Sequence, residues 1–205
     1  MKSKILIIGA GGHAKSVIDV IEATKKYKIV GLIDNDIKKR NKKIYKYNIL
    51  GRDKDLKKIR KFCGLAVIAI GQIKSPKNRI NIFKLLKNLK FKLPIICSQK
   101  SYVSKNSLIK EGTVVFHRAV INAGAKVGKN CIINTGSVIE HDVTIGDNCH
   151  ISTGAVLNGG VTIGDNSFIG SGSVLRENIK VGKNCIISAN TFLNKNLKNN
   201  KIYKS

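Results

Sequence analysis

Residues 121–157 read INAGAK VGKNCI INTGSV IEHDVT IGDNCH ISTGAV L when divided into blocks of six, and each block begins with an aliphatic residue. The same spacing continues without a break from residue 103 to residue 193. A helix repeats about every 3.6 residues and a strand about every two, so neither period explains the pattern. The segment is therefore interpreted as a repeat architecture. Its aliphatic positions are Val103, Ile109, Val115, Ile121, Val127, Ile133, Ile139, Ile145, Ile151, Leu157, Ile163, Ile169, Leu175, Val181, Ile187 and Leu193.

The rest of each block supplies what frequent corners require. The residue four places after the aliphatic one is usually small, as at Ala119, Ser137 and Ala155, and glycine or asparagine provides turn conformations. The pattern resembles the hexapeptide repeat of left-handed parallel β-helices, in which three blocks make one triangular coil. Residues three blocks apart should then stack at about 4.8 Å, the spacing of parallel strands. The alternative, an antiparallel domain of short strands, predicts irregular turn spacing.

Composition limits the class of protein. The chain has 205 residues, of which 42% are hydrophobic, as expected for one large or two small soluble domains. No apolar run is as long as a membrane span and the N-terminus shows no cleavage-type signal, so a cytoplasmic location is expected. The five cysteines are odd in number and lack the close-pair spacing of metal ligands, so no metal site is expected.

The net charge of +26 is concentrated in the first half of the chain. Residues 1–100 contain 26 of the 38 basic residues and six acidic ones, whereas residues 101–193 are nearly balanced. A nucleic-acid binder usually places basic residues among aromatic ones or shows a recognisable module. Here lysine alternates with asparagine and isoleucine, as it would under a composition bias. Nucleic acid is therefore disfavoured as a partner. The positive electrostatic field of the first half is instead expected to attract small molecules that carry phosphate.

The first hundred residues predict a Rossmann-like α/β domain. An apolar strand at 4–8 leads into the turn Gly9-Ala10-Gly11-Gly12-His13 and then a helical pattern over 16–27. Strand, glycine turn and helix N-terminus together form a site whose backbone N–H groups and dipole hold phosphate. A second strand, 29–33, ends at Asp34-Asn35, where a carboxylate can bind ribose or base. Further helices are predicted over 54–62 and 79–89 and further strands over 65–70 and 91–97, with no element assigned to the lysine-rich stretch 37–47.

Two ligand classes compete for this domain. Gly9, Gly11 and Ala14, followed by Asp34, also satisfy the dinucleotide fingerprint, which would favour an NAD-linked oxidoreductase. The glycines could instead serve only the tight turn. About four strands are too few for both halves of a dinucleotide fold, so a mononucleotide or nucleotide-sugar is the expected ligand. The nucleotide-binding domain is expected to span residues 1–98 and the β-helix residues 99–205.

One segment of the repeat departs from the variable polar pattern of a solvated face. His141 lies two residues after an inward aliphatic position, and its stacked neighbours Ala123 and Gly159 are small, so its imidazole is expected in a groove. Imidazole can accept a proton near neutral pH. Asp142 can hold the ring tautomer and stabilise the imidazolium. The alternative is an exposed histidine beside a chance carboxylate. His117 falls on another face of the repeat and is expected to be a surface residue.

Four motifs resemble, in the same order, the bacterial sugar acetyltransferases of the NeuD/PglD type, which include sialic acid O-acetyltransferases and UDP-4-amino-sugar N-acetyltransferases. They are the glycine turn at 9–15, the strand end at 33–35, the strand end at 69–71 followed by Arg79, and the segment 133–142. The resemblance covers nearly the whole chain. It implies an acetyl-CoA-dependent hexapeptide-repeat enzyme that forms a homotrimer through its β-helix, with active sites in the grooves between neighbouring helices.

The resemblance also implies roles for individual residues. His141 is the general base and Asp142 orients it. His150 and Gly159 match positions near the pantetheine and thioester of acetyl-CoA, with His150 belonging to the subunit that faces His141. The family commonly ends in a Gly-x-Pro-Ala-Lys segment that residues 199–205 do not show, so Lys195, Lys198 or Lys201 is expected to replace its contacts with the coenzyme. The nucleotide part of the sugar would be held by Gly9, Gly11, Gly12, His13, Asp34, Asn35 and Gly71.

The expected reaction is direct acetyl transfer from acetyl-CoA to the amino group of a UDP-linked 4-amino-deoxysugar, without a metal or an acyl-enzyme. O-acetylation of sialic acid or a related nonulosonic acid, free or CMP-linked, stays open. A non-catalytic trimer that binds nucleotide-sugars is a further alternative. No membrane partner is expected.

Overall fold

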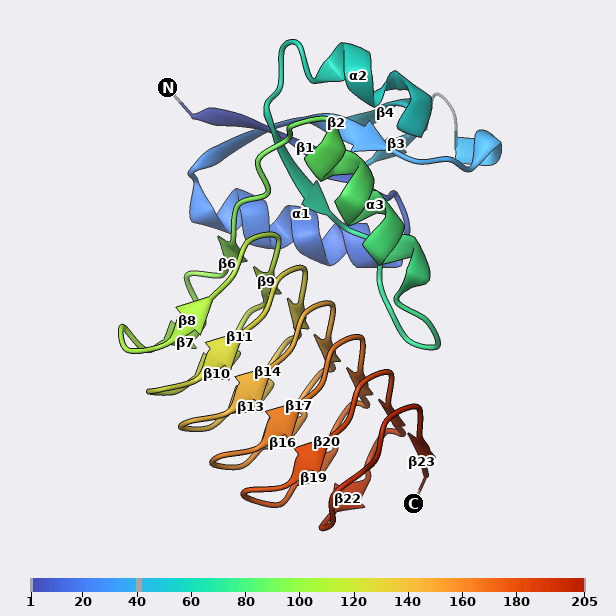
Figure 1. Cartoon of the computed structure of the whole chain (residues 1–205). Helices are drawn as coiled ribbons and strands as arrows, with labels where there is room; N and C mark the ends of the chain where they lie inside the picture. The colour runs from blue at the N-terminus through green and yellow to red at the C-terminus, as the bar shows by residue number, and fades with distance from the viewer. Residues whose placement is uncertain (1, 40–41, 205) are drawn as a thin grey trace.

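The computed structural model describes residues 2–39 and 42–204 and shows an α/β part standing on one end of a β-helix (Figure 1). The α/β part holds a five-stranded sheet in the order β3-β4-β2-β1-β5. Its strands are β1 (Ser3–Ile8), β2 (Tyr27–Ile33), β3 (Lys43–Ile44), β4 (Tyr47–Gly51) and β5 (Leu65–Ile68). β1 pairs in parallel with β2 and β5, β2 pairs in parallel with β4, and β3 is antiparallel to β4.

Helices cover both faces of this sheet. The helix α1 (Gly12–Thr24) packs its buried side chains, among them Val17 and Ile21, against one face. On the other face lie α2 (Leu56–Ile59) and α3 (Lys77–Asn88), and Leu56 and Leu86 share a core with β1 and β5. Short 3₁₀ turns, η1 (Ile37–Lys39) and η2 (Asp53–Asp55), complete the part. This is the α/β domain predicted from the apolar strands and the glycine turn.

One local prediction is wrong, and the structure shows one hairpin where the sequence analysis assigned no element. The expected strand over 91–97 is absent as one element: Phe91 and Leu93 are buried in the core beside α3, and only β6 (Ile96–Cys97) is a strand, which pairs with the β-helix instead. The end of the lysine-rich stretch, Lys43–Ile44, pairs antiparallel with the start of β4 in a hairpin that has Tyr45 at its tip. Tertiary pairing, rather than local pattern, decides the structure of such short segments.

The repeat forms a left-handed parallel β-helix of two-residue strands in three sheets. The valine face consists of β7 (Tyr102–Val103), β10 (Val120–Ile121), β13 (Val138–Ile139), β16 (Val156–Leu157), β19 (Val174–Leu175) and β22 (Phe192–Leu193). The polar face consists of β8 (Leu108–Ile109), β11 (Lys126–Val127), β14 (Thr144–Ile145), β17 (Thr162–Ile163) and β20 (Lys180–Val181). The domain face consists of β6, β9 (Val114–Val115), β12 (Ile132–Ile133), β15 (His150–Ile151), β18 (Phe168–Ile169), β21 (Ile186–Ile187) and β23 (Ile202–Tyr203).

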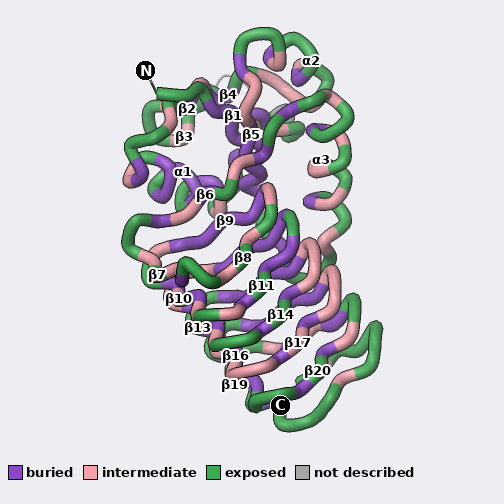
Figure 2. The backbone as a smooth tube through the Cα atoms, turned by 60° about the vertical axis from the view of Figure 1, so that its left-hand side comes forward, coloured by how far each residue is buried: buried purple, intermediate pink, exposed green. Residues whose placement is uncertain are grey.

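The aliphatic residues of the repeat form the core of the prism. Ile121 pairs with Ile139 and Ile139 with Leu157, in register and in parallel, as the stacking of residues three blocks apart predicted. From Val115 onward every aliphatic position on the period is buried, and the small residues such as Ala155 are buried beside them (Figure 2). Removing one of these side chains, as in Ile139→Ala, is expected to destabilise the fold by about 2–5 kcal/mol.

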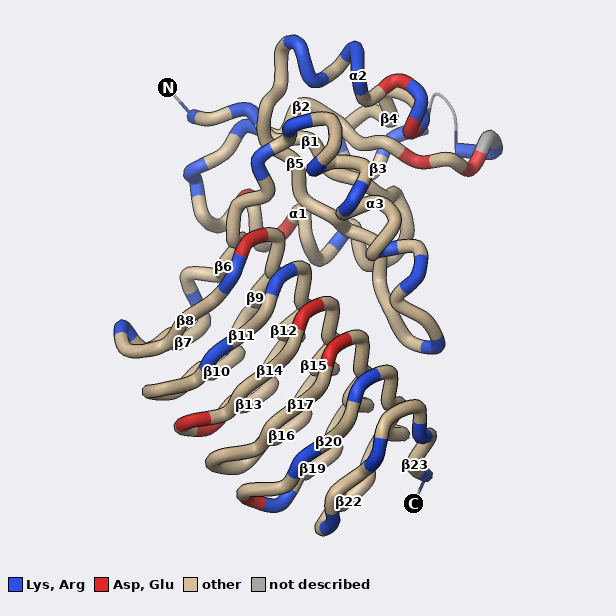
Figure 3. Tube along the Cα trace, in the orientation of Figure 1, with Lys and Arg blue, Asp and Glu red and all other residues tan. Residues whose placement is uncertain are grey.

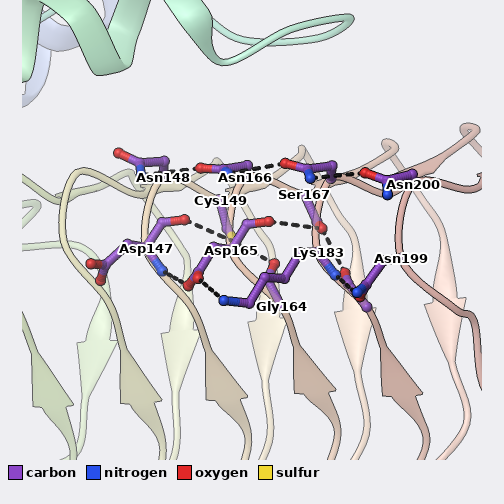
Figure 4. Close-up of polar contacts among 12 residues, drawn as sticks. Asp147, Asn148, Cys149, Gly164, Asp165, Asn166, Ser167, Lys183, Asn199 and Asn200 are labelled. Carbon is purple, nitrogen blue, oxygen red and sulfur yellow. Dashed lines mark hydrogen bonds and ion pairs between the residues drawn. The ribbon is translucent and has the colours of Figure 1, made fainter.

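One corner of the β-helix carries a ladder of asparagines (Figure 4). The amide of each residue donates to the side-chain oxygen of the next coil, at 2.9 Å from Asn130 to Asn148, 3.2 Å from Asn148 to Asn166, and 3.0 Å from Asn166 to Asn184. All of these residues have a left-handed backbone, for example φ 55° at Asn130. Asparagine tolerates this conformation better than other side chains do, and here it also links successive coils.

The two parts of the chain share one core. The helix α1 lies across the first coils, and its buried face meets Ile96, Val114 and Ile132 of the domain face. Lysine and arginine are concentrated on the α/β part, as the sequence indicated (Figure 3). Within residues 2–39 and 42–204, none of the helices has the length and apolar character needed to cross a membrane.

Candidate active site

The corner between β13 and β14 presents His141 and Asp142. Asp142 has a left-handed backbone, φ 60°, and its N–H donates to the carbonyl of Ala123 in the preceding coil at 3.1 Å. The carbonyl of His141 accepts from the N–H of Gly160 in the following coil at 3.0 Å. Backbone contacts on both sides therefore fix the corner, while the side chains of His141 and Asp142 are 66% and 72% exposed.

The two side chains form the pair expected from the sequence. Nδ1 of His141 lies 3.0 Å from Oδ2 of Asp142. Because a carboxylate only accepts hydrogen bonds, Nδ1 must carry the proton that is shared with it. The lone pair of the neutral ring is then on Nε2, which points away from Asp142. This tautomer leaves Nε2 available to remove a proton from a ligand.

Glycine at position 159 makes room for the imidazole. A Cβ added there would lie 2.5 Å from Nε2 of His141 and 2.6 Å from Cε1, well inside van der Waals contact. The φ of Gly159 is not in the left-handed region, so the backbone itself does not require glycine. The small residue therefore leaves room for the ring, which lies over Gly159 and is otherwise largely exposed in the single chain.

A second site lies at the carboxyl ends of β1, β2 and β5. Gly9 has φ 105° and approaches the carbonyl of Ala69 so closely that an added Cβ would lie 3.1 Å from its oxygen. Cβ atoms added at Gly11 and Gly12 would meet nothing within 4 Å. No side chain caps the N-terminus of α1 at Gly11, which leaves backbone N–H groups for an anion. A cavity of about 440 Å³ adjoins this turn, lined by Gly9, Asp34, Asn35, Asp53, Ile70 and Asn78 among others.

Asp34 organises this second site. Its Oδ2 accepts from the N–H of Ala10 at 2.7 Å and from Nζ of Lys39 at 3.0 Å, and its Oδ1 accepts from the N–H of Asp36 at 2.9 Å. Partial burial alone would raise the pKa of Asp34, but these hydrogen bonds together hold its pKa below the usual value. Asn35 exchanges hydrogen bonds with Asp53 beside it, at 2.6 and 3.0 Å. The carboxylate therefore ties the glycine turn to the end of β2 and stays ionised at neutral pH.

His13 and Gly71, also predicted for the nucleotide site, lie at the boundary between the two parts. The Cβ position of Gly71 faces His13 at 3.8 Å, and the His13 ring packs on Phe116 of the β-helix with centroids 5.3 Å apart. Burial, followed by the positive charge of Arg79, lowers the pKa of His13 to about 3. The imidazole is thus neutral, and its Nε2 has no hydrogen-bond partner among the described residues.

Arg79, which the sequence singled out only within a motif, anchors the same boundary. Its guanidinium is buried and donates to the carbonyls of Ile68, Ile70 and Asn130, at 3.0, 3.0 and 3.1 Å. Burial lowers its pKa to about 10, so the group is still charged at neutral pH. It joins the end of β5 to a corner of the β-helix, and no sequence signal indicated those carbonyl partners.

His150 is buried rather than exposed. Its Nδ1–H donates to the carbonyl of Gln72 at 2.5 Å, and its Nε2 accepts from the amide of Asn134 at 3.2 Å. Burial lowers its pKa to about 4, so the ring is neutral. Within one chain His150 lies on the domain face, whereas His141 follows the valine face. The two histidines therefore do not meet inside a single subunit.

His117, expected as a surface residue, instead connects three segments. Its Nδ1 lies 2.6 Å from Oγ of Ser98, and its Nε2 lies 2.8 Å from Oδ2 of Asp19 on α1, 98 residues earlier in the chain. Ser98 is only 3% exposed, so its hydroxyl holds the ring and is not open to a substrate. In the described ranges 2–39 and 42–204, no cluster of histidine, cysteine and acidic residues is arranged to hold a metal ion.

Comparisons with known proteins match both parts of the chain. Residues 4–86 match the family described as PglD N-terminal domain. Residues 124–159 and 160–195 match the bacterial transferase hexapeptide family, and residues 105–141 match the hexapeptide repeat of succinyl-transferase. No curated protein sequence matches the chain.

Solved structures match along almost the full length. A perosamine N-acetyltransferase from Caulobacter crescentus, in complex with CoA and GDP-perosamine, superposes with a TM-score of 0.92 at 26% identity, covering 98% of this chain and 92% of the other. The acetyltransferase domain of PglB from Neisseria gonorrhoeae, in complex with acetyl coenzyme A, gives 0.91 at 27% identity, with 98% and 96% covered. WeeI from Acinetobacter baumannii shares the fold at 22% identity and a TM-score of 0.83, with 96% and 94% covered.

Proposed function

Since this chain belongs to the hexapeptide-repeat sugar acetyltransferases of the PglD/NeuD type, we propose that it acetylates the amino group of a nucleotide-linked 4-amino-deoxysugar with acetyl-CoA, the sugar being UDP-linked. Residues 1–98 would bind the nucleotide and residues 99–205 would carry out the transfer. The observation that carries the proposal is the pair of His141 and Asp142, with Nδ1 engaged at 3.0 Å and Nε2 free above Gly159.

In the proposed reaction the sugar amine attacks the thioester carbonyl carbon of acetyl-CoA. Nε2 of His141 takes the proton that the nitrogen loses as its bond to the acetyl carbon forms. Asp142 stabilises the resulting imidazolium through the Nδ1 hydrogen bond. The carbon–sulfur bond then breaks, and the departing thiolate recovers the proton from Nε2. The products are the N-acetyl sugar and CoA thiol, and His141 returns to its starting tautomer.

Most of the rate enhancement in this scheme comes from holding both substrates beside His141. Well-oriented reactants can gain about 7–11 kcal/mol from proximity alone. The cavity at Gly9, Asp34 and Asn35, about 440 Å³ in volume, is the proposed holder of the nucleotide. Uncapped N–H groups at the start of α1 would bind its phosphates. This handle supports a nucleotide-linked acceptor over free sialic acid, whose binding would leave the glycine turn unused.

The valine face supports assembly into trimers. Its outward residues run in one line, with Tyr102 and Phe192, both 59% exposed, at the ends and partly buried Val120, Val138, Val156 and Val174 between them. The corresponding positions on the polar face include Lys126, Thr144, Thr162 and Lys180. An apolar stripe of this length on a soluble protein marks an interface. Because His141 follows directly after this face, association through it would place a neighbouring subunit beside the imidazole.

In such a trimer His150 would lie at the active site of the facing subunit and would contribute through its position. Its neutral ring is committed to Gln72 and Asn134, so we assign it no proton transfer. It would instead fix the domain boundary near the pantetheine and thioester of acetyl-CoA. Lysines near the C-terminus, Lys195, Lys198 and Lys201, would attract the phosphates at the outer end of the coenzyme.

The proposal is tested by incubating the protein with acetyl-CoA and a panel of UDP- and GDP-linked 4-amino sugars, sialic acid and CMP-sialic acid. Products are identified by mass spectrometry and CoA thiol release is followed in parallel, with a blank lacking acceptor because the protein has five free cysteines of its own. N-acetylation of a nucleotide-linked amino sugar is expected. Acetylation of a sialic acid hydroxyl in preference would refute the acceptor class, and no transfer to any of them would favour a non-catalytic trimer.

A further inference from the structure

The charges of the α/β part are divided between the two ends of its sheet. Four of its six acidic residues, Asp34, Asp36, Asp53 and Asp55, follow the carboxyl ends of β2 and β4. The nucleotide cavity lies at this same end of the sheet. Carboxylates therefore gather where a phosphate ligand would bind, and much of the positive charge lies elsewhere.

The opposite edge of the sheet, where β1, β2 and β5 begin, carries a cluster of basic residues that we call the basic edge (Figure 3). The chain reaches this edge four times: before β1, between α1 and β2, between α2 and β5, and after α3. Lys4 pairs with Lys28 on the neighbouring strand. Lys92 pairs with the first residue of β5, and Nε of Arg60 donates to the carbonyl of Lys90 at 2.9 Å. The basic edge consists of Lys2, Lys4, Lys25, Lys26, Lys28, Arg60, Lys61, Lys90 and Lys92.

The positive charge of the basic edge is not neutralised within the chain. Its lysines are all exposed, and no member forms an ion pair with a residue in the described ranges. Glu22, in the last turn of α1, is already paired with Lys46 and with the hydroxyl of Tyr47. Residues 56–100, which supply four members, contain twelve basic residues and no acidic one. A composition bias toward lysine explains the first number but not the second. Like charges on neighbouring strands repel, and an anionic partner would relieve that repulsion.

Phe62 gives the basic edge an exposed aromatic side chain. It lies in the turn between α2 and β5, beside Arg60 and Lys61, and is 55% exposed. The turn is fixed, because the N–H groups of Phe62 and Cys63 both donate to the carbonyl of Ile59, at 3.1 and 3.0 Å. An aromatic ring on a fixed turn among lysines can enter the boundary between lipid headgroups and acyl chains, while the lysines contact the headgroup phosphates.

An extended anionic surface fits the basic edge better than a small molecule or a nucleic acid does. The basic side chains come from four segments side by side along the sheet, so no single small ligand would engage them all. Nucleic-acid sites usually interleave several aromatic residues with basic ones, whereas Phe62 is the one exposed aromatic residue of the described part of this edge. A cluster of basic residues of this size is typical of segments that attach to anionic phospholipids. A membrane partner was not expected because no segment is long enough to span a membrane, but attachment through this edge needs no such segment.

We propose that the basic edge attaches the protein peripherally to a membrane surface that contains anionic phospholipids, with its lysines on the headgroup phosphates and Phe62 between the headgroups. Attachment through this edge leaves the nucleotide cavity, at the other end of the sheet, facing away from the membrane. Membrane attachment goes beyond the proposed function and does not depend on it.

The test measures co-sedimentation of the full-length protein with lipid vesicles. Vesicles of mixed phosphatidylglycerol and phosphatidylcholine are compared with vesicles of phosphatidylcholine alone, and binding of a single-stranded oligonucleotide is measured separately. The principal variant neutralises four members of the basic edge, one from each segment: Lys4→Gln, Lys28→Gln, Lys61→Gln and Lys92→Gln.

The matched control removes the same amount of charge from the β-helix. It replaces four exposed lysines that form no ion pair within the described ranges: Lys105→Gln, Lys110→Gln, Lys126→Gln and Lys180→Gln. Phe62→Ala is the second variant. The melting temperature of each protein is recorded, because exposed lysines replaced by glutamine should leave the fold unchanged.

Wild type is expected to bind the anionic vesicles but not the neutral ones, and its binding should weaken as the salt concentration rises. Each basic residue near an anionic surface strengthens binding about fivefold, so the principal variant should bind on the order of 10²–10³ times more weakly. Phe62→Ala should weaken binding about tenfold, and the matched control should keep the affinity of wild type.

Equal losses in the principal variant and the matched control would show that net charge alone causes binding, and would overturn the inference. Binding of neutral vesicles as tight as that of anionic ones, no binding of either by wild type, or tighter binding of the oligonucleotide than of the anionic vesicles would also overturn it. The assay uses neither acetyl-CoA nor an acceptor, so any of these results would leave the proposed function standing.

Discussion

The substitution Gly159→Ala tests whether the space that glycine leaves for the His141 ring is needed for catalysis. An added Cβ would lie 2.5 Å from Nε2, whereas ordinary contacts between heavy atoms are about 3.5–4.0 Å. The imidazole must therefore move by about 1 Å or more, and a displacement of that size can reduce the rate about 100-fold. Stability should change little, because alanine is allowed at the backbone conformation of Gly159 and the exposed ring can swing outward.

The assay measures kcat/KM for acetyl transfer together with the melting temperature and the oligomeric state. Gly64→Ala is the matched control, since its added Cβ would lie 3.4 Å from the nearest atom, on Arg60, far from either site. We expect a loss of about 100-fold for Gly159→Ala, an unchanged control, and similar melting temperatures for all three proteins.

The double variant of Gly159→Ala and His141→Ala shows whether the two substitutions act on the same group. If Gly159→Ala acts only by displacing the imidazole, adding it to His141→Ala should cause no further loss, because residues that act as a unit are non-additive. A Gly159→Ala enzyme that retains activity within about threefold of wild type, or losses that simply multiply in the double variant, would refute the reasoning.

Four further predictions concern other parts of the structure. Asp142→Asn should lower kcat/KM by less than loss of His141 does, and an unchanged kcat/KM would remove its orienting role. Val138→Asp should convert trimers to monomers in sedimentation, because it places a charge in the centre of the valine face; an unchanged mass would exclude that face as the interface. Arg79→Met should lower the free energy of unfolding by several kcal/mol, on the order of 3, in urea titrations, since two buried carbonyls and one partly buried carbonyl lose their donor. The pKa of Asp34 is lower in the folded than in the unfolded state, so its contribution to stability is present above about pH 4. That contribution is lost as the pH falls through the folded-state pKa. Asp34→Asn should therefore be less stable than wild type at pH 7, and the difference in stability should shrink in acid.

The fold of the β-helix could be predicted from sequence because its signal is periodic. The block of six places each aliphatic residue over the one three blocks earlier, as Ile121, Ile139 and Leu157 do in the structure. The contact of the His141 ring with Gly159 follows from the same six-residue spacing, since residues three blocks apart stack on one another. The glycine turn could also be predicted, because its strand, turn and helix N-terminus are contiguous in the chain.

What the sequence did not reveal depends on contacts between the two parts. His117 meets Asp19 from 98 residues away and His150 meets Gln72 from 78 residues away, and no pattern in one segment encodes a partner in another. The hairpin β3–β4 and the division of residues 91–97 have the same origin, since their pairing is decided by neighbouring strands rather than by propensity.

The most direct measurement is the kcat/KM of His141→Asn for the best nucleotide-linked amino sugar, with trimer mass and melting temperature recorded on the same samples. Asparagine preserves polarity and approximate size but cannot accept a proton at neutral pH. The account predicts a loss on the order of 10²–10⁴ in kcat/KM with an intact, equally stable trimer. An enzyme that acetylates the amine within about threefold of the wild-type rate would contradict it.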